Sequence, residues 1–357
     1  MQPINTALLS YGMSGKLFHG PFLQVHKGFD FYACWQRTKN DVHEKYPTVK
    51  IYRGIEELLA DEAIELVIVN SPSFTHFQYA KQALLAGKNV VVEKPFTATT
   101  AEARELIELA AEKKLMLSVY QNRRYDSDYL TVKKIIDEQW LGDIVEAEFH
   151  YDRFKEVITP LPLKEQPNAA AGVLYDLGSH IIDQALQLFG LPQSVFGDVR
   201  IARKLSMIDD YYEVLLYYPD KRVRLRSSYI VREHLPAYVL HGNKGSFIKA
   251  KTDVQEQCLL NGQLPDTDNW GVEPPNEKGL LHTEKNGEII KRQIDSLLGN
   301  YMNFYEGLYQ AIRNNHLPPV APVESLYVIA VIEAAMESSK QKKVVSFKGG
   351  FQNSNVE

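Results

Sequence analysis

The first 120 residues alternate between short apolar runs and segments of helical periodicity, and this alternation constrains the fold most strongly. Helical spacing of apolar side chains is clearest over residues 77–86 and 101–111. The apolar runs typical of buried strands lie at 4–10, 29–35, 66–69, 90–92 and 115–119. Strands that alternate with helices of this length predict a doubly wound parallel sheet, an α/β domain, over residues 1–121.

Two helix ends in this region carry local signals. Gly87 follows the first helical segment, where a residue in the left-handed conformation commonly ends a helix. Thr99 and Glu102 have the spacing of a capping box, in which each side chain bonds the backbone of the other. Both signals support the predicted helices.

After about residue 140 the pattern changes to strands with alternating polar and apolar residues. The predicted strands are 144–153, 195–202, 211–218 and 222–231, the predicted helices are 177–188, 301–312 and 323–339, and a loop is expected over 261–279. In the last strand Val223, Leu225 and Ser227 are expected to face one way and Arg224, Arg226 and Ser228 the other. Residues 122–357 are therefore predicted to form an α+β domain with a large open antiparallel sheet.

The composition narrows the class of protein. A length of 357 residues suits two domains, and 40 Lys+Arg against 45 Asp+Glu give a net charge of −5. This charge is too mild to indicate nucleic acid or an anionic membrane as a partner. The sequence has no apolar run of about eighteen residues, so no membrane span is predicted. The first residues lack the pattern of a secretory signal. With only Cys34 and Cys258, no disulfide framework is expected, and a cytoplasmic location is favoured.

A glycine-containing turn follows the first predicted strand. The stretch Ser10-Tyr11-Gly12-Met13-Ser14-Gly15 stands where Rossmann dinucleotide-binding folds carry G-x-G-x-x-G. Gly12 is expected to let the backbone approach the pyrophosphate, Gly15 to allow close helix–strand contact, and Met13 and Ser14 to complete the turn. Ser10 replaces the first glycine, so a purely structural turn is the alternative.

The residues after the second and third strands bear on the choice of nucleotide. No Asp or Glu stands at the end of the second strand, where an NAD-specific site carries an acid for the ribose. Arg37 and Thr38 stand there instead and suit a 2′-phosphate, which predicts NADP with NAD as the alternative. Arg37 could equally be a solvated surface arginine. Ser71, Pro72 and His76 are expected beside the nucleotide, although His76 also suits a structural role at a helix start.

A lysine ends the fourth predicted strand, in Glu93-Lys94-Pro95. Ligands of doubly wound sheets bind at the carboxyl ends of the strands, so Glu93 and Lys94 are expected beside the nucleotide. The Lys94 ammonium suits a developing oxyanion, as in the oxidation of an alcohol by a nicotinamide. An ordinary surface lysine is the alternative, and Pro95 allows a cis peptide bond after Lys94.

Asp176 and His180 form a second candidate cluster. Four residues apart on a helix, they share one face and can address one ligand. His180 is the candidate general base, and Asp176 is expected to accept a substrate hydroxyl or to orient the imidazole. A helix cap and a buried structural histidine are the alternatives. Asp183 lies on the same face, but one histidine and two carboxylates are too few to predict a metal site.

Polar residues near two other strand ends are candidates for binding substrate hydroxyls. Asn122 and Arg124 follow the fifth strand of the first domain, and Tyr151 and Arg153 end the first strand of the second. A polyol or sugar needs several such donors and acceptors around it. These four residues are predicted to bind the substrate.

The chain resembles the Gfo/Idh/MocA oxidoreductases over nearly its whole length. The most specific elements are Glu93-Lys94-Pro95 and Asp176-Leu177-Gly178-Ser179-His180. Within the family the likeness is strongest to NADP-dependent scyllo-inositol dehydrogenases, carried by Phe18-His19 and the stretches 118–124, 175–184 and 333–340. Two departures are Ser10, where many members have glycine, and Lys155, where the subgroup often has arginine; the second puts the substrate in question.

The resemblance implies that Lys94, Asp176 and His180 are the catalytic trio of an NADP-dependent dehydrogenase acting on a cyclic polyol or sugar. Scyllo-inositol and its ketone are the expected pair, and another aldose or keto-sugar is the rival. The resemblance also implies association of second-domain sheets into a homodimer or homotetramer. A non-catalytic NADP sensor is a different class of protein, disfavoured because a sensor does not need all three catalytic residues. A nucleic-acid binder is disfavoured by the acidic balance.

Overall fold

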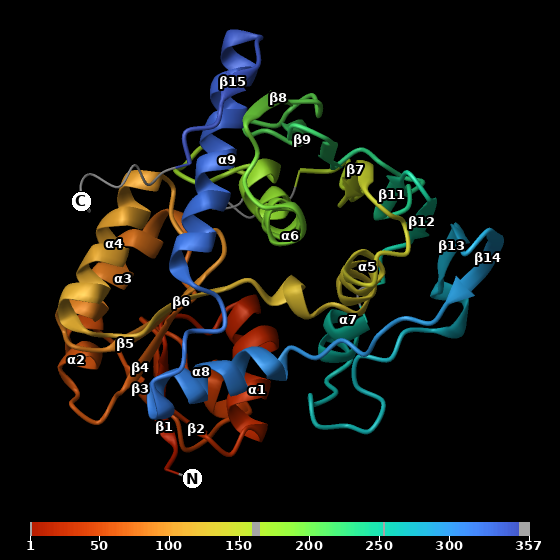
Figure 1. Ribbon diagram of the computed structural model, residues 1–357. Helices are drawn as coiled ribbons and strands as arrows, with labels where there is room; N and C mark the ends of the chain where they lie inside the picture. Colours follow the sequence, from red (N-terminus) through yellow and green to blue (C-terminus); the bar gives the residue numbers. More distant parts are fainter. Residues whose placement is uncertain (1, 159–164, 253, 350–357) are drawn as a thin grey trace, which may run out of the picture. The chain divides into compact units, whose positions relative to one another are not determined.

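The computed structural model describes residues 2–158, 165–252 and 254–349, which divide into two compact units (Figure 1). The first unit comprises Met1–Asn122 together with Val254–Trp270 and Asn300–Ser325. The second comprises Arg123–Asp253, Gly271–Gly299 and Leu326–Glu357. The sequence prediction placed all of residues 122–357 in one domain, whereas two later segments pack with the first unit.

The first unit contains a six-stranded sheet in the order β3-β2-β1-β4-β5-β6, with every neighbouring pair parallel. The order reverses between β1 and β4, as in Rossmann folds. Its strands are β1 Ile4–Leu8, β2 Phe29–Trp35, β3 Lys50–Tyr52, β4 Leu66–Val69, β5 Asn89–Glu93 and β6 Leu117–Tyr120. Its helices are α1 Gly20–Val25, α2 Ile55–Ala60, α3 His76–Leu85, α4 Thr100–Lys113, α7 Val254–Leu260 and α8 Met302–Asn314. The doubly wound parallel sheet predicted from the sequence is confirmed.

Local sequence signals explain where these elements end. The capping box is present, with the Thr99 side chain accepting from the Glu102 amide and Glu102 accepting from the Thr99 amide. Gly87 has a φ of 76°, a left-handed conformation that suits the residue after α3. The side chains of β4 are wholly buried, because a parallel strand in this fold is covered on both faces.

Two later segments complete the first unit through aromatic packing. The Phe22 ring of α1 stacks on Tyr305 of α8 with centroids 5.0 Å apart, and it meets Trp270 edge-on at 6.1 Å. Helices α1 and α8 lie side by side in Figure 1 although they are far apart in the sequence. The Gln255 side-chain oxygen accepts from Trp270 Nε1 at 3.0 Å and from the Tyr301 amide at 2.7 Å. One buried amide thereby joins both returning segments.

The second unit contains a nine-stranded sheet in the order β14-β13-β12-β11-β7-β10-β9-β8-β15, antiparallel except for the pair β7 and β10. Val223, Leu225 and Ser227 are buried on one face and Arg224 and Arg226 are half-buried on the other, as predicted. Ser228, predicted on the second face, is buried as well, and its amide donates to the Asp152 carboxylate. The strands are β7 Ile144–His150, β8 Ser194–Arg200, β9 Tyr211–Tyr217, β10 Arg222–Ser228, β11 Tyr238–Gly242, β12 Gly245–Lys249, β13 Gly279–Lys285, β14 Glu288–Ile294 and β15 Val345–Ser346. Helices α5 Ser127–Asp137 and α6 Ser179–Phe189 belong to this unit, and α9 Pro322–Gln341 runs from the first unit into it.

Strands β11 to β14 extend the sheet beyond the sequence prediction. The hairpin β13–β14 turns at Asn286 and Gly287, whose φ values are 55° and 82°. Asn-Gly is the preferred turn for two-residue hairpins, so this signal could have revealed both strands. Among the described residues, the chain has no helix whose length and apolar character would let it cross a membrane.

Candidate active site

The carboxyl edge of the first sheet brings together five of the predicted groups. The glycine turn follows β1, Arg37 follows β2, Ser71 follows β4, Lys94 follows β5 and Asn122 follows β6. Because all these strands are parallel, their carboxyl ends lie at one edge, where doubly wound sheets bind ligands. The first unit therefore carries the predicted nucleotide-binding residues and Lys94, whereas Asp176 and His180 belong to the second unit.

The glycine turn keeps close backbone packing despite the serine at its first position. A Cβ on Gly15 would lie 2.5 Å from the Ser10 carbonyl oxygen, so the helix can approach the strand only with glycine there. The Ser10 hydroxyl accepts from the Gly12 amide at 3.2 Å, and Asn70 Nδ2 donates to the Ser10 carbonyl at 2.8 Å. Gly12 and Met13 are exposed. The turn thus presents accessible backbone, as nucleotide binding requires.

The residues after β2 form an exposed, cationic loop. Arg37 and Thr38 are exposed, and within the described part of the chain the Arg37 guanidinium makes no ion pair. Arg53 braces the loop by donating to the carbonyl oxygens of Gln36 and Lys39, each at 2.7 Å. An exposed arginine on a braced loop fits a phosphate ligand. Arg53 was not predicted from the sequence, because it follows a short strand that has no clear signal of its own.

The acidic residue nearest to this loop in the sequence is already engaged. The Asp41 carboxylate accepts from Lys16 Nζ at 2.9 Å and from the Gln36 side chain. The hydrogen bond from Lys16, followed by that from Gln36, holds the pKa of Asp41 below its usual value. Asp41 is thus ionised and paired with the Lys16 ammonium. Its carboxylate does not pair with Arg37.

His76 begins α3, as predicted, and links two loops of the carboxyl edge. Its Nδ1 lies 2.8 Å from the Pro95 carbonyl oxygen and its Nε2 lies 3.0 Å from that of Ser71. The ring is buried, and this burial lowers the pKa of His76. The Ser71 hydroxyl meets the Thr75 hydroxyl at 2.7 Å. The ring therefore lies between the loop after β4 and the loop after β5, and in its neutral form it donates to one of their two carbonyls.

Lys94 and Glu93 have different surroundings at the end of β5. Lys94 is half-buried, and the peptide bond from it to Pro95 is cis. Glu93 is buried and accepts from the Ser14 hydroxyl, from His19 Nε2 at 3.0 Å and from the Lys94 amide at 3.1 Å. Burial favours the neutral acid, but His19, the Ser14 hydrogen bond and the Lys94 charge together outweigh it, so the pKa of Glu93 is lowered. The carboxylate is thus ionised and satisfied inside the chain.

Asp176 and His180 lie on consecutive helical segments of the second unit. Asp176 belongs to a π-helical turn, Leu174–Gly178, and His180 to α6 directly after it, where the sequence predicted one regular helix. The Tyr229 hydroxyl donates to the Asp176 carboxylate at 3.2 Å. The Leu174 amide donates to the Asp209 carboxylate at 2.9 Å, which fixes the start of the turn. Burial raises the pKa of Asp209 to about 6.

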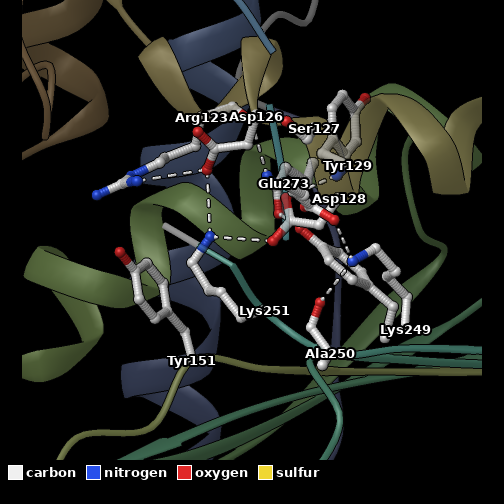
Figure 2. A network of polar contacts seen from close by, with 12 residues as sticks. Arg123, Asp126, Ser127, Asp128, Tyr129, Tyr151, Lys249, Ala250, Lys251 and Glu273 are labelled. Atoms are coloured by element: carbon white, nitrogen blue, oxygen red, sulfur yellow. Dashed lines mark hydrogen bonds and ion pairs between the residues drawn. The ribbon is translucent and has the colours of Figure 1, made fainter. Parts of the chain in front are cut away.

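The Tyr151 ring lies beside His180 and is contacted by the cationic side chains of Arg153 and Lys251. The two rings lie 6.0 Å apart, and Arg153 donates to the Tyr151 hydroxyl at 3.2 Å. Lys251 Nζ lies 4.9 Å from the Tyr151 ring centre and makes ion pairs with Asp126 at 3.1 Å and with Asp128 (Figure 2). A small pocket in this unit is lined by Arg123, His150, Tyr151, His180, Ile181, Gln184, Tyr238 and Lys251. The structure thus brings two predicted residues, Tyr151 and His180, into one pocket.

Lys251 and Arg123 are pocket residues that the sequence analysis did not select. Lys251 lies far along the chain from the other site residues and follows a strand, β12, that was not predicted. Arg123 stands beside two predicted residues in Asn122-Arg123-Arg124, but adjacent arginines give no sign of which one lines a pocket. The pairing of β12 with β11, and of β11 with β7, brings Lys251 near Tyr151.

Arg124 has a partner inside the second unit. Its Nε and Nη2 atoms donate to the two oxygens of Asp183, at 2.7 and 2.6 Å. This bidentate geometry joins the segment after β6 to α6, the helix that carries His180. If Arg124 binds the substrate, as predicted, its guanidinium does so while it is also bonded to Asp183.

Two models of one protein family match consecutive parts of the chain. The model described as the NAD-binding Rossmann fold of the Gfo/Idh/MocA oxidoreductase family matches residues 4–121. The model of the C-terminal alpha/beta domain of the same family matches residues 133–347. Together the matches span most of both units.

Individual relatives are similar over almost the full length. A scyllo-inositol 2-dehydrogenase (NADP(+)), IolW of Bacillus subtilis, is 40% identical over 342 residues, which are 96% of this chain and 95% of that protein. The solved structure of the putative oxidoreductase YvaA from Bacillus subtilis has a TM-score of 0.93 at 39% identity, covering 97% of this chain and 99% of that one. A putative oxidoreductase from Bacteroides fragilis has a TM-score of 0.88 at 44% identity, covering 97% of this chain and 100% of that one.

Proposed function

The chain belongs to the Gfo/Idh/MocA family of NAD(P)-dependent oxidoreductases, and on that premise we propose that it oxidises a secondary alcohol of a cyclic polyol to the ketone, and reverses this reaction. NADP is the proposed nucleotide and scyllo-inositol the proposed substrate. The observation that carries the chemistry is the presence of Lys94 at the end of β5 together with Asp176 and His180 around the start of α6. The substrate rests on the 40% identity to the scyllo-inositol dehydrogenase.

The proposed chemistry needs one proton acceptor and one group that stabilises negative charge. His180 removes the hydroxyl proton, because an imidazole can take up a proton near neutral pH. The Lys94 ammonium stabilises the oxygen as it becomes an alkoxide. Asp176, held by the Tyr229 hydroxyl, orients the substrate or the imidazole. The nicotinamide accepts the hydride that leaves the carbon, so the alcohol loses one hydride and one proton.

The residues of the first unit fit the proposed nucleotide. The exposed backbone of Gly12 and Met13, with Ser14 and Gly15, would hold the pyrophosphate, and Ser71 and Pro72 would border it. Arg37 and Thr38 would hold a 2′-phosphate. The preference for NADP rests on the exposure of the Arg37 guanidinium and on the engagement of Asp41 by Lys16.

The proposed substrate-binding residues differ in their burial and in their hydrogen bonds to other residues of the protein. Tyr151 is buried and Arg153 is half-buried beside it, so their phenol and guanidinium form one polar surface. Asn122 is buried at the end of β6. Arg124 donates two hydrogen bonds to Asp183, so it is fixed beside α6. Several fixed donors of this kind suit a ligand with many hydroxyl groups.

The test is to mix the purified protein with NADP and scyllo-inositol and to follow nicotinamide reduction, with NAD and myo-inositol in parallel. Reduction that depends on NADP and is fastest with scyllo-inositol is expected. Fast reduction with an aldose instead would overturn the substrate but keep the chemistry. Tight NADPH binding without reduction of the nucleotide by any polyol or sugar would favour a non-catalytic sensor.

A substitution separates catalysis from nucleotide binding. Lys94→Ala removes the ammonium but leaves Glu93, His19 and the glycine turn in place. We expect turnover to fall by about a hundredfold to a thousandfold, because electrostatic stabilisation of this kind contributes that much to rate. NADPH affinity should change by less than about threefold. Unchanged turnover would contradict the catalytic assignment.

A further inference from the structure

Four polar side chains meet inside the first unit, and we call Ser14, His19, Glu93 and Tyr305 the buried quartet. His19 is wholly buried, with Nε2 at 3.0 Å from the Glu93 carboxylate and Nδ1 at 2.8 Å from the Tyr305 hydroxyl. The Ser14 hydroxyl donates to the same Glu93 oxygen that His19 contacts. The quartet thus connects the glycine turn, β5 and α8.

His19 lies between the Glu93 carboxylate and the Tyr305 hydroxyl. Glu93 is an ionised carboxylate, which can only accept, so His19 Nε2 donates to it. The Tyr305 hydroxyl lies 2.8 Å from His19 Nδ1 and 2.6 Å from the Phe18 carbonyl, which the Tyr120 hydroxyl also contacts at 3.0 Å. His19 and Glu93 therefore form a buried hydrogen-bonded pair.

The wide turn of the helix brings His19 to this position. Residues Gly15–His19 form a π-helical turn in which the Gly20 amide bonds the Gly15 carbonyl. Pro21 follows and has no amide hydrogen to donate, which favours a break in the regular bonding pattern at this point. A Cβ on Gly20 would lie 2.9 Å from the Gly15 oxygen, so glycine is needed where the turn closes. The π turn directs His19 inward beneath the glycine turn.

We propose that His19 and Glu93 are positioning residues for the nicotinamide nucleotide, which act by holding Ser14 and the glycine turn against the end of β5. Glu93 accepts from Ser14, His19 and the Lys94 amide, so its carboxylate serves the protein scaffold. Glu93 was predicted to lie beside the nucleotide, and we propose that it acts on the nucleotide indirectly, through Ser14. Because Lys94 follows Glu93, the same carboxylate fixes the nucleotide turn and the backbone of the proposed catalytic lysine relative to each other.

Two isosteres of histidine separate the two contacts of His19. The amide nitrogen of Gln takes the place of Nε2, so His19→Gln retains the donor to Glu93 and loses the contact of Nδ1 with Tyr305. The amide nitrogen of Asn takes the place of Nδ1, so His19→Asn retains a contact with Tyr305 and loses the donor to Glu93. If the Glu93 contact positions the turn, the two variants differ in nucleotide affinity even where they are equally stable.

The measurement is NADPH affinity by fluorescence titration, with the melting temperature of each variant measured alongside. We expect His19→Asn and Ser14→Ala to weaken NADPH binding by at least about tenfold and His19→Gln by less than about threefold. His26→Asn is the matched control, because His26 pairs with Glu306 at 3.1 Å in the same unit but does not contact the turn; its NADPH affinity should equal that of the wild type.

Equal NADPH affinity in His19→Asn and His19→Gln would overturn the proposal, whatever their melting temperatures. If His19→Asn does not fold, Ser14→Ala decides the matter, because Ser14 is half-buried and its hydroxyl can be removed without opening the core. Unchanged NADPH affinity in Ser14→Ala would then refute the positioning role. The inference rests on the nucleotide binding common to the family and not on the proposed substrate, so an inactive protein that still binds NADPH leaves it testable.

Discussion

The ion pair between Arg124 and Asp183 makes a strong prediction about stability. The two hydrogen bonds are 2.7 and 2.6 Å long, and the side chains are only 10% and 3% exposed. Removing one partner leaves the other charge buried, which typically costs about 3–5 kcal/mol. We therefore expect Arg124→Met and Asp183→Leu each to lower the free energy of unfolding by about that amount.

The double variant tests the reasoning more sharply than either single one. Arg124→Met with Asp183→Leu replaces the buried pair by apolar side chains, and such replacements are often neutral or stabilising. The free energy of unfolding should return to within about 1.5 kcal/mol of the wild type. The measurement is urea denaturation followed by far-UV circular dichroism, from which the coupling energy of the pair is obtained.

An exposed pair on the same unit serves as the control. Lys133 and Asp137 on α5 are 2.6 Å apart but 45% and 57% exposed, so their replacement should change stability little. The reasoning about burial is refuted if the two single variants at Arg124 and Asp183 are as stable as the control, or if their effects simply add. Near-wild-type stability of Arg124→Met with a raised KM would instead assign Arg124 to the substrate.

Three further predictions follow from individual contacts. Arg37→Asp should weaken NADPH binding by at least about tenfold and leave NADH binding no weaker, as measured by fluorescence titration. Burial raises the pKa of Asp209 from 3.8 to about 6. As the pH rises, the Asp209 carboxyl therefore ionises at a lower pH in the unfolded chain than in the folded one. The free energy of unfolding is expected to fall between about pH 4 and 6 for this reason. Asp209→Asn should remove this loss, up to about 3 kcal/mol, in denaturation curves across that range. We also propose the homodimer or homotetramer that the family resemblance implies, and Leu215→Glu on the half-buried face of β9 should shift the mass in light scattering toward the 40.7 kDa of one chain.

The sequence was most informative where a local pattern determines the structure. Strands β2 and β4 begin and end at the residues predicted. Strand β4 is a continuous buried apolar run between turns, as is typical of a parallel strand that is covered on both faces. Thr99 and Glu102 predicted a helix start correctly because a capping box involves only neighbouring residues. The alternation in β10 predicted which side chains face the core.

The sequence was least informative where distant segments meet. Nothing local in 254–270 or 300–325 shows that they pack on α1, because the stacking of Phe22 on Tyr305 is a property of the pair. Periodicity at α6 could not distinguish a regular helix from one preceded by a π turn. Arg124 shows the same limit, since its position after β6 suggested a ligand, whereas its partner Asp183 lies 59 residues further along the chain.

The residues on either side of Lys94 fix the backbone of this proposed catalytic residue. Glu93, immediately before it, is held by His19 at 3.0 Å, and the Pro95 carbonyl, immediately after it, is held by His76 at 2.8 Å. The backbone of Lys94 is therefore fixed on both sides by buried imidazoles, while its own side chain stays half-buried. His76 also holds the loop after β4, and His19 acts through Glu93 on the glycine turn. A lysine whose backbone is fixed in this way suits the role proposed for Lys94, because an ammonium stabilises a developing alkoxide best when it needs little reorganisation.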